Sequence, residues 1–266
     1  MMLEVLAIVA AALLGLATVA GGLAVFAVQG RWKDIAVGAR VLALVAVIAA
    51  LVAAAAVHGR WTAADPRQAL LSLVVAMLAV HLALAWRLGA GSAGPMVDIV
   101  ALALSLVCAF AIQPASPETI CPQLPAMVQG QWVLLSLGGG SMLVTGCAGL
   151  MLALRKGLLW RGLDAQLPDR LPLVGMLTQA ACLAVVALGG GLFLGVWWSW
   201  RTSGRLADDD VRQVWMAVAW LLSAMSVLSW QADSRTSRWA AVLALVAAAA
   251  VLVGTLAPAG LSVMAT

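Results

Sequence analysis

The sequence predicts an all-α integral membrane protein, a single bundle of about eight transmembrane helices. Hydrophobic residues make up 64% of the 266 residues and charged residues only 10%, whereas a soluble domain carries about 25% charged residues. Apolar stretches of about 20 residues, the length that crosses a bilayer, recur along the whole chain with short connections between them. Tryptophans gather near the ends of these stretches, as they do where membrane helices meet water.

Each apolar stretch is expected to be α-helical, because backbone groups in lipid must find their hydrogen bonds within their own segment. The expected spans are about 3–28, 35–57, 68–88, 97–114, 130–154, 172–197, 212–231 and 239–257. The short connections predict one polytopic domain over residues 1–266. The first stretch is not expected to be a cleaved signal, since Glu4 stands where a basic region would be and the apolar run is long enough to span.

Lysine and arginine concentrate at one end of the predicted bundle, at Arg31, Lys33, Arg40, Arg87, Arg155, Lys156, Arg161, Arg170, Arg235 and Arg238. The opposite end holds only Arg60, Arg67, Arg201, Arg205 and Arg212. The positive-inside rule therefore predicts that both termini and the connection before residue 212 lie outside. This is the expected arrangement of a multi-pass protein in a bacterial-type inner (cytoplasmic) membrane. The net charge of +4 follows from these loops and does not indicate a nucleic-acid partner.

Glycines cluster in two of the predicted helices, at Gly138, Gly139 and Gly140 and at Gly189, Gly190, Gly191 and Gly195. Small residues let helix backbones approach closely, and this favours tight helix–helix packing. The alternative is a bare backbone surface that accepts a flat ligand.

One histidine falls well inside an apolar stretch, and one aspartate lies at the end of another. His81 lies among Leu, Val and Ala, and an ionisable group at membrane depth is a functional hypothesis by default. A neutral imidazole is a good axial ligand for haem iron, and the alternative is a histidine bonded to a neighbouring helix. Asp98 is expected to face solvent or to cap its helix. The run Asp208–Asp209–Asp210 is expected to cap the helix that follows it.

The sequence favours a non-enzymatic role. No Ser/His/Asp set converges and no CxxC pair is present, so neither hydrolysis nor thiol–disulfide chemistry is indicated. Cys108, Cys147 and Cys182 are expected to be packing residues, and Cys121 lies in a connection.

The stretch from Gly195 to Trp220 resembles the WWD region of the cytochrome c assembly family, whose members are membrane proteins that handle haem. The positions in register with the family pattern are Gly195, Trp198, Gly204, Asp210, Trp215 and Trp220. Three central tryptophans of that pattern are replaced, by Ser203, Ala207 and Asp209. The likeness extends to His81, Trp86-Arg87, Gly94-Pro95 and Trp132, so that it covers about residues 75–266.

The resemblance implies a haem cofactor held by histidines. Of the four histidine positions of the family only His81 remains, since Ser136, Leu228 and about Ser262 stand at the others. His81 is thus the candidate iron ligand. The resemblance adds Trp198, Gly204, Asp210, Trp215 and Trp220 as candidate cofactor-binding residues.

Three functions compete. The first is a cytochrome c assembly-like protein involved in haem handling and cytochrome biogenesis. The second is a non-catalytic scaffold subunit of a larger respiratory or photosynthetic membrane complex, which keeps the fold without haem. A transporter ranks last, because no polar or broken helices recur in matching halves. The expected partners are the lipid bilayer and other membrane subunits, with haem or a c-type cytochrome under the first hypothesis.

Overall fold

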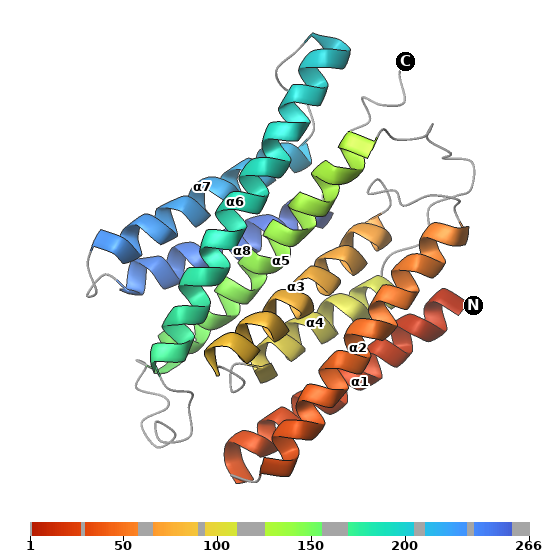
Figure 1. Ribbon diagram of the computed structural model, residues 1–266, viewed down its shortest axis with the longest axis vertical. Helices are drawn as coiled ribbons and strands as arrows, with labels where there is room; N and C mark the ends of the chain where they lie inside the picture. The colour runs from red at the N-terminus through yellow and green to blue at the C-terminus, as the bar shows by residue number, and fades with distance from the viewer. Residues whose placement is uncertain are drawn as a thin grey trace.

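Each predicted span is an α-helix in the computed structural model, shown in Figure 1. The helices are α1 (Met2–Ala27), α2 (Gly30–Val57), α3 (Pro66–Leu88), α4 (Gly94–Phe110), α5 (Ala126–Arg155), α6 (Arg170–Ser203), α7 (Val211–Ala232) and α8 (Ser237–Leu256). The structure describes residues 2–27, 30–57, 66–89, 94–110, 126–155, 170–204, 211–232 and 237–256. Within these ranges the chain contains no strand, so the predicted all-α class is confirmed.

Most helices extend a few residues beyond the predicted apolar limits, because helical hydrogen bonding continues into the polar ends of a span. The largest difference is at α6, which reaches Ser203 instead of about 197. The helix stops at Gly204, whose N–H donates to the carbonyl of Trp200 over 3.1 Å. Gly204 has a φ of 69°, the left-handed conformation that glycine adopts after the last helical turn.

The helices run alternately up and down, as Figure 1 shows. The starts of α1, α3, α5 and α7 therefore lie at one end of the bundle, together with the ends of α2, α4, α6 and α8. We call this end the α1-start end and the other the α1-finish end. Trp132 of α5 and Trp215 of α7 lie toward the α1-start end, and Trp32 of α2 and Trp86 of α3 toward the α1-finish end. Tryptophans thus lie near both ends of the bundle, as expected from their places in the sequence.

Two four-helix groups with the same order of contacts make up the bundle. In the first group α1 contacts α2 and α4, and α3 contacts α2 and α4. In the second group α5 contacts α6 and α8, and α7 contacts α6 and α8. Helix α3 joins the groups through its contacts with α5, α6 and α8. Residues on α3 therefore lie at the joint between the two halves.

The glycines of α5 fit against neighbouring backbones. A Cβ on Gly138 would lie 2.7 Å from the backbone nitrogen of Leu188, and one on Gly140 would lie 2.6 Å from that of Met77. On α6, a Cβ on Gly191 would lie 2.8 Å from a side-chain carbon of Leu135. Protein atoms occupy these glycine surfaces, so the helix-packing interpretation is confirmed.

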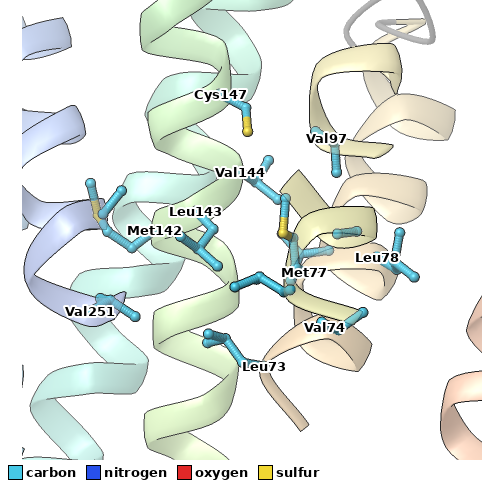
Figure 2. Close-up of a cluster of buried hydrophobic side chains, with 14 of the residues drawn as sticks. Leu73, Val74, Met77, Leu78, Val97, Met142, Leu143, Val144, Cys147 and Val251 are labelled. Carbon is cyan, nitrogen blue, oxygen red and sulfur yellow. The ribbon is translucent and has the colours of Figure 1, made fainter. Parts of the chain in front are cut away.

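The joint between the two groups is packed with apolar side chains (Figure 2). Leu73 and Met77 of α3 meet Leu143 and Val144 of α5, and Val97 of α4 lies beyond them. Met77 and Met142 are fully buried. Methionine fills irregular space between helices well, because its side chain is unbranched and flexible.

The outward surface of the bundle is also apolar. Phe193 of α6 is 68% exposed and Leu228 of α7 is 63% exposed. Apolar patches of this kind are rare on soluble monomers. Six of the described helices are long and apolar enough to cross a membrane, and two shorter apolar stretches belong to α1 and α4. The protein is therefore a multi-pass membrane protein with its outer helix faces in lipid.

Candidate functional site

A small cavity lies between α3, α5, α7 and α8 near the α1-start end. The residues that line it include Trp132 and Ser136 of α5, Arg212 of α7, Thr255 of α8, Leu73, Met216 and Gly254. Its volume is about 20 Å³, enough for about one water molecule. Ser136 occupies the position where the resemblance expects a haem-ligating histidine. Instead, its hydroxyl lies 2.9 Å from that of Ser72 on α3.

Trp220 is held inside the bundle. Its indole Nε1–H donates to the carbonyl of Val185 over 3.0 Å, which ties α7 to α6. A Cβ on Gly189 would lie 2.9 Å from the same Nε1, so the absence of a side chain at Gly189 makes room for the indole. The hydrogen bond satisfies the one polar atom of a half-buried tryptophan. Trp220 thus pins two helices together.

The other tryptophans of the predicted site lie nearer the surface. Trp198 is half-buried near the end of α6. Trp215 is at the start of α7, and a Cβ added to Gly254 would lie 3.0 Å from the Cβ of Trp215. Trp200 is 57% exposed. Arg201 lies over the ring of Trp197, 6.0 Å from its centroid, within the range of a cation–π interaction. The end of α6 therefore presents exposed indoles beside a positive charge.

Two other residues of the predicted site follow the last helical turn of α6 in the sequence. Gly204 is exposed and ends α6. Asp210, together with Asp208 and Asp209, lies outside the described residues. The same holds for His58 and Cys121.

His81 is completely buried on α3. Neither ring nitrogen finds a hydrogen-bond partner among the described residues. The alternative of a histidine bonded to a neighbouring helix therefore has no support in the described part of the bundle. An unpaired polar group in a buried site costs about 1–3 kcal/mol, so His81 calls for an explanation.

An ion pair that the sequence reasoning missed lies in the first helix group. Arg40 of α2 donates from Nε to both carboxylate oxygens of Asp98 on α4, over 2.8 and 2.9 Å. Its Nη2 lies 2.8 Å from Oδ2, but without the alignment of a further hydrogen bond. The two side chains are 3% and 0% exposed. Asp98 was expected to face solvent or to cap its helix. Instead, it is buried and neutralises an arginine inside the bundle.

Glycines make room for this guanidinium. A Cβ on Gly94 would overlap the guanidinium of Arg40, and one on Gly21 of α1 would lie 3.2 Å from Nη2 and 2.9 Å from Pro95 Cγ. Gly94 and Pro95, the first residues of α4, therefore have a local packing role. The signal that would have found the pair is the presence of opposite charges in two otherwise apolar stretches, since charges at membrane depth pair with one another.

The cysteines divide between the core and the surface. Cys108 and Cys147 are buried, as expected, but Cys182 is exposed on α6, so the packing interpretation was wrong for it. The thiol of Cys147 lies 3.9 Å from the carbonyl of Met96. Within the described ranges, no group of three or more His, Cys, Asp or Glu side chains comes together as a metal site would require.

No family model, curated protein or solved structure matches this chain. The fold and the buried charges define its class, which is a polytopic α-helical membrane protein with an ion pair inside the bundle.

Proposed function

We propose that this protein is a non-catalytic membrane subunit that works beside haem-handling proteins in cytochrome c assembly. In this role it keeps the helical bundle of the family it resembles and offers its tryptophan-rich α1-start end to partner proteins. In this role the protein does not ligate haem iron. The resemblance over about residues 75–266 supports the pathway, and the eight-helix architecture is compatible with it.

The observation that carries the scaffold role is the cavity beside Trp132 and Ser136. Its volume of about 20 Å³ is far below the several hundred Å³ of typical ligand sites. The residue at the expected ligand position is a serine engaged with Ser72. Buried indoles here contribute packing, and the exposed ones on α6 remain available for a partner.

A photocrosslinking experiment tests this role. A benzoylphenylalanine at Trp200 is expected to give a discrete adduct that contains a c-type cytochrome or a haem-handling membrane protein. A matched probe at Val186 on the same helix, 73% exposed, is expected to give no such adduct, because that face contacts lipid. Equal labelling from both positions, or adducts with lipid alone, would contradict the proposal.

The second candidate is direct haem binding through His81. The observation in its favour is that both ring nitrogens are unpaired, which leaves one of them free to ligate iron. This function requires a Soret band in the gently solubilised protein and its loss in His81→Ala. An iron-free spectrum together with the cytochrome adduct favours the subunit role.

The orientation belongs to the same proposal. We place the α1-start end outside an inner (cytoplasmic) membrane, because the lysines and arginines gather at the other end. In a cysteine-free variant, a cysteine at Gly204 is then expected to react with an impermeant maleimide added outside. A cysteine at Gly89 is expected to react only after the membrane is opened. The reverse pattern would invert the orientation.

A further inference from the structure

Three buried side-chain nitrogens toward the α1-finish end of the bundle have no hydrogen-bond partner among the described residues. They are Nη2 of Arg40 and both ring nitrogens of His81. The three atoms belong to α2 and α3, and Asp98 on α4 completes the ion pair with Arg40. This concentration is unusual, because the great majority of buried polar atoms in proteins are hydrogen-bonded.

The helices that carry these side chains contact one another, since α3 packs against both α2 and α4. On α5, the thiol of Cys147 lies 3.9 Å from the carbonyl of Met96, two residues before Asp98. All four residues lie toward the α1-finish end of their helices, which are α2, α3, α4 and α5. Figure 2 shows Cys147 above Val144 on the side of α5 that faces Val97 of α4. We call these four residues the polar cluster.

Two glycines make room for the guanidinium of the cluster. Gly94 and Gly21 leave the space that the guanidinium of Arg40 fills. Asp98 accepts two hydrogen bonds from one nitrogen of the guanidinium, and this leaves Nη2 with N–H groups to donate. The site therefore has unused donors next to a carboxylate that can accept more.

The unused atoms match the chemistry of water. A neutral imidazole carries one N–H donor and one acceptor nitrogen, and an arginine nitrogen only donates. A water molecule can accept from Arg40 Nη2 and donate to the acceptor nitrogen of His81, and a second can accept from the imidazole N–H and donate to Asp98. A metal ion fits less well, because the described part of the cluster brings no three metal-ligating side chains together.

We propose that one or two ordered water molecules bridge His81 to the Arg40–Asp98 ion pair and make the polar cluster a hydrated site inside the bundle. Buried waters typically make about three hydrogen bonds to otherwise unpaired groups. The bridge joins α3 to α2 and α4, and the described helices form no backbone hydrogen bonds with one another. The inference is independent of the proposed function, which concerns the opposite end of the molecule.

Nitrogen NMR of the histidine rings tests the proposal. The chain has two histidines, so His58→Gln leaves His81 as the only imidazole. In lipid nanodiscs with ¹⁵N-labelled histidine, the His81 ring is expected to be neutral and to receive magnetisation from water protons within milliseconds. Asp98→Asn is expected to shift its ring signals. Asp34→Asn, which makes the same charge change at an exposed position of α2, is expected to leave them unchanged.

The outcomes are distinct. A ring that receives no magnetisation from water would overturn the proposal, and this measurement needs no variant within the cluster, so it stands even where Asp98→Asn does not fold. Ring signals that ignore Asp98→Asn in a folded protein would also overturn it. Ring signals broadened by paramagnetic iron, together with a haem absorption band, would show that His81 binds haem iron and not water. That result would overturn this proposal and the non-ligating subunit role as well. Hydrated signals without a cytochrome adduct at Trp200 would leave this proposal standing and refute the subunit role.

Discussion

Neutralising one partner of the Arg40–Asp98 ion pair is expected to destabilise the protein far more than removing both. Asp98→Asn retains the shape of the side chain but leaves the guanidinium of Arg40, 3% exposed, without its counter-charge. At a charge separation of about 4 Å and an effective dielectric constant of about 20, the lost attraction is about 4 kcal/mol. This agrees with the loss of about 3–5 kcal/mol that is typical when a buried pair is broken.

The double variant Arg40→Met/Asp98→Leu removes both charges and their desolvation cost together. Replacements of this kind are neutral or stabilise by about 1–4 kcal/mol in proteins where they have been made. We therefore expect the double variant to be at least as stable as the parent. Asp34→Asn is the matched control, expected within about 0.5 kcal/mol of the parent because its side chain is exposed.

The measurement is unfolding by SDS in mixed micelles, followed by helical circular dichroism and extrapolated to zero SDS. Two results would refute the reasoning. One is a loss of unfolding free energy below about 1 kcal/mol for Asp98→Asn, because a buried charge that has lost its counter-charge costs more than that. The other is a double variant as unstable as the single one, which would mean that the polar groups are needed for packing.

Three further variants probe the remaining contacts by the same unfolding measurement. Trp220→Phe loses the hydrogen bond to α6 and is expected to lower the free energy of unfolding by about 0.5–1.5 kcal/mol. Trp200→Phe, at an exposed position, is the control. Equal losses of stability in the two variants would argue against a contribution of the hydrogen bond. Gly140→Ala places a Cβ 2.6 Å from a backbone nitrogen and is expected to cost about 1–3 kcal/mol. Gly22→Ala, with open space around it, is expected to gain up to about 1 kcal/mol, and the packing argument fails if the two glycines behave alike. Ser136→His overfills a cavity of about 20 Å³ and is expected to lower stability by about 1–3 kcal/mol without creating a haem band; a stable, haem-binding variant would show that this region opens.

The number and place of the helices were predictable because lipid imposes one rule on every span. Apolar length alone located all eight helices. The end of α6 was misplaced because apolar length measures the lipid-covered part of a helix, while the helix continues to the glycine that stops it. Gly204 gave that stop signal in the sequence.

The contents of the bundle were less predictable, because they depend on which helices are neighbours. Asp98 is four residues past Gly94, near a helix start, and that position alone is compatible with a solvated cap. Only the placement of α2 beside the glycines of α1 and α4 brings Arg40 to it. Similarly, the sequence singled out Trp220, but its hydrogen bond to α6 depends on the space at Gly189.

Helix α6 is too long for the membrane that surrounds it. Its 34 residues span about 51 Å at about 1.5 Å per residue, against a hydrocarbon thickness of about 30 Å. Even a tilt of about 40°, at the upper limit for membrane helices, leaves a vertical extent of about 39 Å. Figure 1 shows the last turns of α6 rising above the neighbouring helices. A macromolecule diffusing toward the bilayer from that side therefore meets Trp200 and Arg201, in the last turns of α6, before the rest of the described bundle. The side chains of these turns would make the first contacts with it.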